Sequence, residues 1–322
     1  RAALSEDANN GGSRYSSDEW RDWWCSDDAA VYQFIGQDNI FFYCIVQNPL
    51  WDALDWGLIT DTPVANYHIL FMNKKASSSG AIKPPMAEEL LEFYTPEQLR
   101  AHWLSLGLDQ RAVSFSPKAF DTSVSRKGKD GEPDLLVKDD PRVVDPALKE
   151  SAFLTNIFNR MARSCLYGAA NACGGHLPIS EPHQEVIDAA QEVLLKYEQL
   201  AYGFDAHSAL AVVDEYARAE NKRWGEASKA AQGNDEAYDQ ALADAFYALK
   251  TITLLMHPAV PEGCERIADA LNFPHEEFFS WENAFMGPKE LAAKLGQSPE
   301  EHQLEELPPR FDFFKAHPSQ KN

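Results

Sequence analysis

The sequence predicts two kinds of structure: part of a parallel, nucleotide-binding α/β sheet in the first 120 residues, and an antiparallel α-helical bundle after residue 150. Two β-prone runs, 31–35 and 67–72, lie about thirty residues apart with a helical segment between them, which is the interval that a parallel crossover needs. Beyond residue 150, apolar side chains recur at helical spacing over long segments. The fold class predicted is therefore α/β plus all-α.

The first β-prone run ends at Gly36, and Asp38 and Asn39 follow it before an apolar segment at 40–46. This pattern is typical of a strand, a tight turn and a helix. A glycine there lets the backbone approach a ligand, and a carboxylate at the start of the helix can accept hydrogen bonds from ribose hydroxyls. A plain turn with a helix cap would have the same residues, so this motif alone does not decide between the two.

A polar loop is predicted directly after Met72, with the sequence Asn-Lys-Lys-Ala-Ser-Ser-Ser-Gly at 73–80. Its cations and hydroxyls can fold over a triphosphate and neutralise the charge that develops as pyrophosphate leaves. A solvated surface loop would have the same composition. The candidate residues in this loop are Lys75, Ser77, Ser78 and Ser79.

A helix is predicted to begin at Thr95, because Thr95 can cap it, Pro96 suits its first position and Gln98 completes a capping box. After a charged stretch at 121–150, apolar stripes predict four helices and a shorter fifth one at 261–271. The stripes are Leu154, Ile157, Met161 and Cys165; Ile187, Ala190, Leu194, Tyr197 and Ala201; Leu210, Val213, Ala217 and Trp224; and Leu242, Phe246, Leu249, Ile252 and Met256.

These patterns divide the chain into four predicted segments. They are a nucleotide-binding domain with its following helix at 1–120, a charged insertion or linker at 121–150, a helical bundle at 151–310 and a C-terminal tail at 311–322. Because the chain begins with Arg1 and shows no signal-peptide pattern, we expect a fragment of a longer cytoplasmic protein.

Composition narrows the classes of partner. The chain has 29 Lys and Arg against 50 Asp and Glu, a net charge of −21, which argues against a generic basic coat for nucleic acid and leaves local patches to meet any such partner. No apolar run approaches the roughly 20 residues that span a bilayer, so we expect no membrane partner. Because the chain has five cysteines and no C-x-x-C pair, we expect neither a zinc knuckle nor a disulfide framework.

In the predicted bundle, Arg218, Arg223 and Trp224 on the third helix and Trp281 after the fifth are candidates for contacts with RNA bases. Tryptophan on a helix is more often part of the core, and this alternative stays open here.

The order of these features resembles the C-terminal half of a class I aminoacyl-tRNA synthetase, and most closely the methionyl-tRNA synthetase family. The strand motif of that family reads Phe-Ile-Gly-Lys-Asp, and Phe34, Ile35, Gly36 and Asp38 match it. The family's Lys-Met-Ser-Lys-Ser loop is matched by Lys75, Ser77 and Ser79. The segment 96–100 resembles the helix after that loop, and Trp224 and Trp281 fall near tryptophans of the family's anticodon-binding bundle.

The sequence also departs from the family pattern. Ser78 stands where the loop has its second lysine, and Tyr43 stands where the family has a histidine in its methionine pocket. The position of the anticodon-reading asparagine falls on Glu215, with Asn221 as a nearby alternative. The His-Ile-Gly-His signature of the first half of the catalytic domain does not occur in this chain.

The resemblance implies a methionine-tRNA ligase that activates methionine with ATP and passes it to tRNA, with this chain supplying only part of the enzyme. Gly36, Asp38 and Lys75 would contact ATP with its Mg²⁺, and Tyr43 would line the amino-acid pocket. The implied partners are tRNA, ATP and methionine, without DNA or zinc. The residues implied to contact tRNA are Arg218, Asn221, Trp224 and Trp281.

Two other hypotheses remain open. A catalytically degenerate synthetase paralogue would keep the fold to bind RNA or a protein partner, which the altered positions Ser78, Tyr43 and Glu215 favour. Alternatively, the chain could belong to a class I synthetase for valine, leucine or cysteine, since these share the helical bundle.

Overall fold

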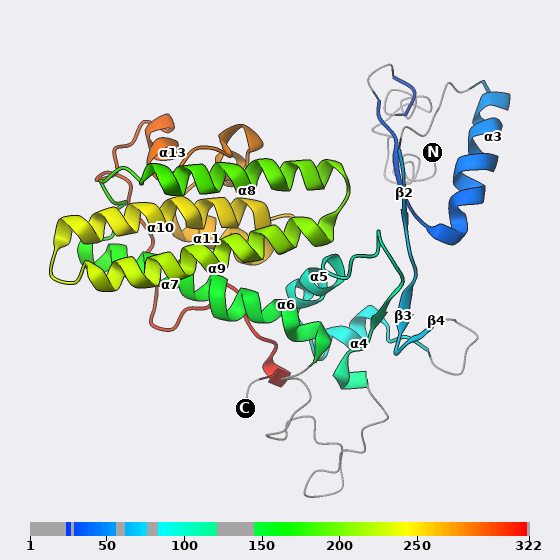
Figure 1. Cartoon of the computed structure of the whole chain (residues 1–322), viewed down its shortest axis with the longest axis horizontal. Helices are drawn as coiled ribbons and strands as arrows, with labels where there is room; N and C mark the ends of the chain where they lie inside the picture. Colours follow the sequence, from blue (N-terminus) through cyan, green and yellow to red (C-terminus); the bar gives the residue numbers. More distant parts are fainter. Residues whose placement is uncertain (1–23, 27–28, 56–61, 76–82, 121–144, 321–322) are drawn as a thin grey trace, which may run out of the picture. The chain divides into compact units, whose positions relative to one another are not determined.

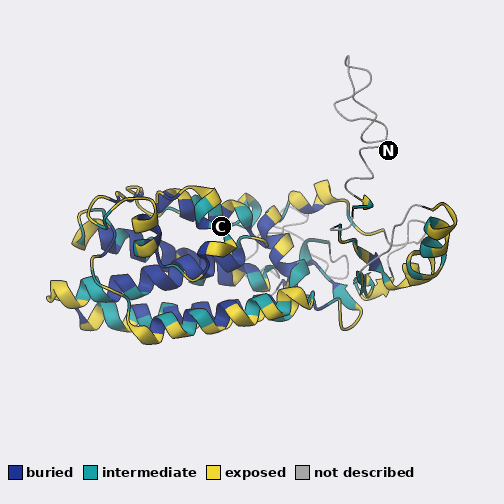
Figure 2. Ribbon diagram, turned by 90° about the horizontal axis from the view of Figure 1, so that it is seen from above, coloured by how far each residue is buried: buried dark blue, intermediate teal, exposed yellow. Residues whose placement is uncertain are grey.

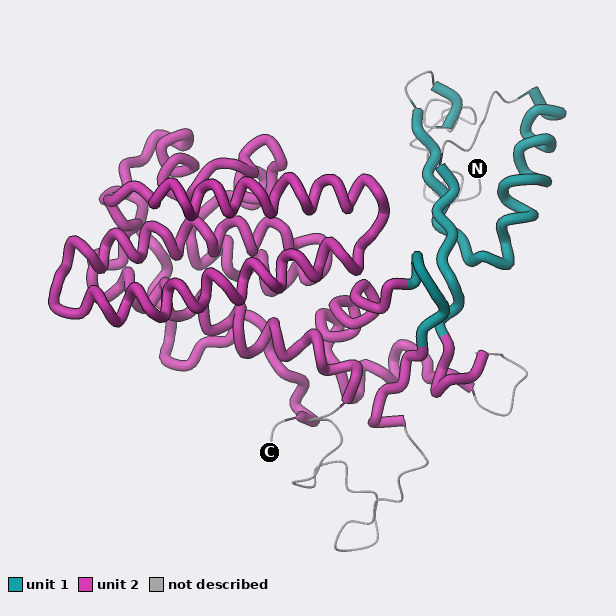
Figure 3. Tube along the Cα trace, in the orientation of Figure 1, with its two compact units in different colours: residues 1–69, 108–113 teal, residues 70–107, 114–322 magenta. Residues whose placement is uncertain are grey.

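The computed structural model describes residues 24–26, 29–55, 62–75, 83–120 and 145–320. Its backbone forms two compact units, one of residues 1–69 and 108–113 and the other of residues 70–107 and 114–322 (Figure 3). These units are not the four predicted segments, whose boundaries stay a prediction.

The first unit is built on a parallel pair of strands, β1 (Tyr32–Gly36) and β2 (Thr62–Asn66), in register from Tyr32 opposite Thr62 to Gly36 opposite Asn66. The connection between them contains a 3₁₀ turn at Gln37–Asn39, a π-helical segment at Phe41–Val46 and α3 (Gln47–Ala53) (Figure 1). The predicted succession of strand, turn and helix is confirmed.

The predicted second parallel strand is placed wrongly. The partner of β1 is β2, and the run predicted at 67–72 instead contributes β3 (Ile69–Phe71) to a separate three-stranded sheet of order β4-β3-β5, with β4 at Lys74–Lys75 and β5 at Val113–Phe115. Periodicity missed β2 because Thr62-Pro63 reads as a turn. A proline is nevertheless tolerated in a strand that can leave its nitrogen unpaired at a sheet edge.

In the second unit, the predicted helices are all present. The first runs as α6 (Lys149–Ala152), a π-helical segment at Phe153–Phe158 and α7 (Asn159–Ala172). It is followed by α8 (Gln184–Tyr202), α9 (Ala206–Ala230), α10 (Asp235–Met256) and α11 (Pro261–Ala270). Short turns at 203–205 and 231–234 reverse the chain, so α8, α9 and α10 are antiparallel neighbours (Figure 1).

These helices bury one continuous apolar core, and α10 lies at its centre, since its residues from Ala245 to Met256 are all buried (Figure 2). Two short helices, α12 (His275–Phe278) and α13 (Pro288–Lys294), follow α11. The segment predicted as a tail also packs into this core, because Phe313 and Phe314 are buried there.

A smaller core in the same unit surrounds Phe71, Tyr94 and Phe115 and takes in α4 (Ala87–Leu91) and α5 (Pro96–Leu104). Residues 121–144 of the predicted charged insertion lie outside the described residues, but its end is part of this core. Asp145 accepts a hydrogen bond from the Tyr94 hydroxyl at 2.6 Å and others from the backbone of Lys118 and Ala147. Burial raises the pKa of the Asp145 carboxyl above its usual range.

Candidate functional site

The glycine of the strand motif leaves room for the Asp38 side chain close to the strand end. Gly36 ends β1 with an extended backbone, and a Cβ added there would lie 2.8 Å from the Asp38 carboxylate oxygen. The side chain of Asp38 therefore folds back over the strand end. Asp38 is exposed in the first turn of the 3₁₀ segment, where a ligand can reach its carboxylate.

Tyr43 lies in the π-helical segment that follows, with its ring partly exposed. The segment carries several other exposed apolar side chains, including Phe41, Phe42 and Ile45. The role of Tyr43 in an amino-acid pocket stays a prediction.

The loop predicted after Met72 begins differently from the expectation. Met72 and Asn73 both have a positive φ, of 50° and 63°, and form the tight turn of a hairpin that pairs Phe71 with Lys74 and Leu70 with Lys75. Lys74 and Lys75 are thus strand residues, both exposed, rather than loop residues. Ser77, Ser78 and Ser79 lie outside the described residues.

Asp38 belongs to the first compact unit and Lys75 to the second. The expectation that both reach one bound nucleotide therefore stays a prediction.

The helix after the loop is capped as predicted, with the Thr95 hydroxyl accepting from the Gln98 amide at 3.3 Å. Its first turn also fixes α5 to the bundle. The Glu97 carboxylate accepts from the Gly263 amide at the start of α11 at 2.7 Å, and the Arg100 guanidinium donates to the carbonyls of Pro258 and Ala259. Burial raises the pKa of Glu97. One turn of α5 thus satisfies backbone groups that neighbouring helices leave unpaired at their ends.

The four predicted RNA contacts do not share one environment. Trp224 is 6% exposed, its indole nitrogen donates to the Ser164 hydroxyl at 2.7 Å, and its ring packs edge-on against Tyr238. For Trp224 the core alternative is confirmed, and the prediction that its ring is available to an RNA base is wrong. The side chain is part of the bundle core, because the core needs a large apolar group where α7, α9 and α10 meet.

Trp281, by contrast, is 40% exposed, in a 3₁₀ turn at Trp281–Asn283. Arg218 is half-exposed on α9, where its guanidinium pairs with Asp214 at 2.8 Å. Asn221 lies one turn further along α9 and is partly buried, while Glu215 is exposed. Arg218, Asn221 and Trp281 stay candidate contacts.

Arg218 also lines a cavity of about 310 Å³ between α5, α6 and α9. Lys149 and His207 line the same cavity, so three basic side chains from two helices face it. His207 contacts the Ser105 carbonyl, which orients its ring. Two acids are also present, Asp214 and Glu150, and each has a basic partner, Arg218 and His102 respectively.

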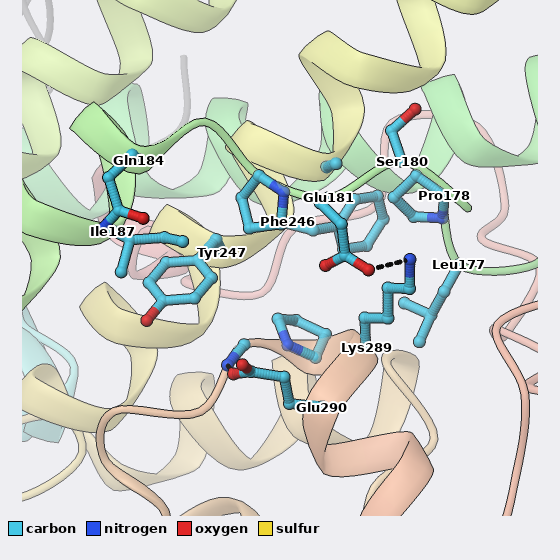
Figure 4. Close-up of a pocket in the computed structure, with 14 residues that line it drawn as sticks. Leu177, Pro178, Ser180, Glu181, Gln184, Ile187, Phe246, Tyr247, Lys289 and Glu290 are labelled. Carbon is cyan, nitrogen blue, oxygen red and sulfur yellow. Dashed lines mark hydrogen bonds and ion pairs between the residues drawn. The ribbon is translucent and has the colours of Figure 1, made fainter.

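A second cavity, of about 200 Å³, lies between the start of α8, the middle of α10 and the start of α13 (Figure 4). Lys289 closes one side through an ion pair with Glu181 at 2.6 Å, and Phe246 and Tyr247 line it from α10. Besides this ion pair, the Tyr247 hydroxyl donates to the Phe285 carbonyl and the Glu290 carboxylate accepts from the Gly287 amide.

Sequence patterns missed Lys250, a lysine with 0% exposure in the middle of α10. A signal was present, since Lys250 interrupts a run of apolar residues between Leu249 and Ile252. Within the described residues, no helix is long and apolar enough to cross a membrane, and no three His, Cys, Asp or Glu side chains are grouped as metal ligands.

Comparison with known proteins relates both the sequence and the fold to one family. The family described as tRNA synthetases class I (M) matches residues 6–127. The methionine-tRNA ligase of Methanoculleus marisnigri is 22% identical over 262 residues, which are 79% of this chain and 35% of the relative. That of Porphyromonas gingivalis is 36% identical over 76 residues. Most of the chain is thus similar in sequence to methionine-tRNA ligases, and its first part matches the class I (M) synthetase family.

A solved methionyl-tRNA synthetase, that of Mycobacterium tuberculosis bound by methionyl-adenylate, has the same fold, with a TM-score of 0.66 and 18% identity over 97% of this chain and 55% of that one. Its apo form gives a TM-score of 0.63 at 16% identity, over 90% of this chain and 50% of that one. The chain thus spans about a third of the length of the first curated methionyl-tRNA synthetases that it matches, and about half of these solved ones.

Proposed function

We propose that this chain is part of a methionine-tRNA ligase and supplies the distal part of its ATP site together with its anticodon-binding bundle. The observation that carries the proposal is the order of parts. A strand that ends at Gly36 and is followed by Asp38, a hairpin that ends at Lys75 and the capped helix α5 precede a bundle, in a chain that is similar to methionine-tRNA ligases.

In this proposal Gly36 and Asp38 hold the nucleoside of ATP, and Tyr43 lines the methionine pocket. The methionine carboxylate attacks the α-phosphorus of ATP, forming the adenylate and releasing pyrophosphate with its Mg²⁺. Lys75, Ser77, Ser78 and Ser79 contact the phosphates. An exposed cation such as Lys75 stabilises the charge that grows on the leaving group, which is the main contribution a protein makes to such a transfer.

The bundle would then hold the tRNA. Unpaired anticodon bases stack on exposed aromatic rings, which suits Trp281, and Arg218 and Asn221 provide hydrogen-bond donors. Lys149, His207 and Arg218 also give the cavity between α5, α6 and α9 hydrogen-bond donors for a backbone phosphate, beside the carboxylates of Glu150 and Asp214.

We assign these activities to a cytoplasmic protein with the segments 1–120, 121–150, 151–310 and 311–322 as its parts.

Exchange of labelled pyrophosphate into ATP tests the catalytic part in the full-length protein that contains this chain. We expect methionine-dependent exchange, reduced roughly 100-fold by Lys75→Met, because one cation at a developing charge is worth about 3 kcal/mol. Lys74→Met is the matched control, since Lys74 is the exposed neighbour in the same strand. A folded protein without exchange, or equal loss in both variants, would refute the assignment.

A degenerate paralogue that binds RNA or protein without catalysis is the second candidate. Ser78 in place of a lysine, the exposed acid Glu215 and the net charge of −21 favour it. Titration of initiator and elongator methionine tRNA against salt separates the cases when exchange is absent. A steep negative dependence of affinity on salt indicates phosphate contacts, whereas no binding at low salt indicates a protein partner.

A further inference from the structure

Lys250 is a lysine within an apolar core, and its ammonium group contacts one short segment. The side chain is fully buried in α10, and its Nζ donates to the carbonyls of Asn283 at 2.5 Å and Ala284 at 3.1 Å. Burying an amine is costly unless it is hydrogen-bonded, so its partners matter for the fold. Both partners belong to the turn that carries Trp281.

The next carbonyl of the same segment is held from the same helix face. Tyr247, one turn before Lys250 on α10, donates its hydroxyl hydrogen to the Phe285 carbonyl at 2.8 Å. Three successive carbonyls, those of Asn283, Ala284 and Phe285, therefore accept hydrogen bonds from two side chains of α10.

The opposite side of the turn is fixed by side chains as well. The Asn283 amide group donates to the Glu277 carbonyl at 2.8 Å and to its carboxylate at 2.9 Å. Lys294 of α13 donates to the Asn283 side-chain oxygen at 2.9 Å and to the same carboxylate at 2.8 Å. The backbone after Trp281 is thus held between α10, α12 and α13.

The ring of Trp281 lies outside this framework and remains accessible. It is 40% exposed, its indole nitrogen donates to the Glu198 carboxylate on α8 at 2.8 Å, and the Tyr197 ring centre lies 6.5 Å away. A ring whose backbone is fixed and whose edge is hydrogen-bonded loses little freedom when a base stacks on it, which strengthens stacking.

We propose that Lys250 is a positioning residue for RNA binding, which holds the backbone after Trp281 so that the indole ring is presented to an unpaired base. The proposal rests on the proposed function, because it takes RNA as the ligand of Trp281. Without the Lys250 amine, the Asn283 and Ala284 carbonyls would be buried without that donor, and the turn would shift to recover hydrogen bonds.

The chemistry of the amine is compatible with this role in either protonation state. Burial lowers the pKa of Lys250 to about 7, against the opposing influence of Glu290. A neutral amine still has two N–H groups, one for each of the two carbonyls. The positioning therefore does not depend on a charge at neutral pH.

A double-mutant cycle on the full chain tests the coupling. Binding of a fluorescent anticodon stem-loop of methionine tRNA is followed by anisotropy for the unaltered chain, Lys250→Met, Trp281→Ala and the double variant. We expect Trp281→Ala to weaken binding roughly 10-fold, as for the loss of one stacked base, and Lys250→Met to weaken it by a similar factor. The double variant should bind as Trp281→Ala does, since Lys250 acts through that ring.

Lys222→Met on α9 is the matched control. It makes the same substitution at a lysine whose side chain is 76% exposed, so no buried hydrogen bond is lost. Hydrogen exchange of the Ala284 and Met286 amides, which donate to the Trp281 and Asn283 carbonyls, reports on the turn without RNA. In Lys250→Met these amides should exchange faster while those of α8 and α9 keep their protection.

The results distinguish a failure of the RNA role of Trp281 from a failure of the positioning role of Lys250. If the unaltered chain does not bind the stem-loop, or if Trp281→Ala binds normally, the RNA role of Trp281 is refuted, and the role of Lys250 with it. If Trp281→Ala weakens binding but Lys250→Met does not, or if the two losses multiply in the double variant, only the positioning role is refuted. Unchanged exchange at Ala284 and Met286 in Lys250→Met also refutes it.

Discussion

The bundle and the β1–α3 region contain similar apolar residues but use them differently. In the bundle, helices α7 to α11 cover one another, and their apolar side chains form one closed core. In the first unit, Ile35 is the one buried hydrophobic side chain among the described residues, whereas Tyr32, Phe34, Phe41 and Phe42 are exposed. A bundle of antiparallel helices closes its core locally, but two paired strands need further layers to cover them.

A matched pair of phenylalanines makes this contrast measurable and has the largest expected effect. Phe246→Ala, in the centre of α10 at 1% exposure, should lower the free energy of unfolding by about 3–5 kcal/mol, since it removes a buried ring and leaves a cavity. Phe34→Ala, at 65% exposure in β1, should change it by less than about 1 kcal/mol. Urea denaturation of the full chain measures both. Equal losses would contradict the division between a closed core and an uncovered strand.

Two glycines sharpen the same comparison with a smaller effect. A Cβ at Gly263 in α11 would lie 2.1 Å from the buried Phe314 ring, so Gly263→Ala should cost about 1–3 kcal/mol by overpacking. A Cβ at Gly36 would crowd the end of the exposed Asp38 side chain, which can rotate away, and would make an ordinary contact of 3.7 Å with the Asn39 side chain. Gly36→Ala should therefore leave the thermal midpoint nearly unchanged. If Gly36→Ala destabilised the protein as much as Gly263→Ala, the strand end would be rigidly packed.

The buried amine of Lys250 gives a pH test of how well the core excludes water. Its pKa is lowered from 10.5 to about 7 by burial, with Glu290 opposing the shift. Between these values the unfolded chain binds more protons, so the free energy of unfolding should rise with pH, by at most about 1.4 kcal/mol per unit. The slope between pH 7 and 9 should be smaller in Lys250→Met and unaltered in Lys222→Met. Parallel profiles for all three proteins would mean that Lys250 is solvated.

The smallest expected effect concerns the helix that precedes the bundle. Thr95→Ala removes the side-chain cap of α5 and should cost about 1 kcal/mol, measured by urea denaturation. Ser105→Ala, at the other end of the helix, is a control, because its hydroxyl donates to the His102 carbonyl and caps no amide. If both substitutions lowered the free energy of unfolding equally, the capping box would not be what fixes the start of α5.

The sequence predicted the helices well because their signals are local. Apolar side chains three and four residues apart mark one face of α7 to α10, and residues such as Thr95 and Pro96 mark where a helix begins. Pairing in sheets is not local, so β2 was missed and the hairpin at Lys74 and Lys75 was expected as a loop. The left-handed Met72 and Asn73 in its turn have no strong sequence signature, because glycine usually takes such positions.

The candidate site residues could be found from motifs in the sequence, but their burial and their contacts could not. Gly36, Asp38 and Lys75 were found from their order along the chain, whereas only packing distinguishes the buried Trp224 from the exposed Trp281. The partners of Lys250 lie more than thirty residues away, so no local pattern reveals them. The sequence by itself determined the helices, their caps and the family resemblance, since spacing and side-chain chemistry act within a few residues. Tertiary structure alone decided which strands pair, which tryptophan is accessible and which lysine holds it, because each depends on contacts between distant segments.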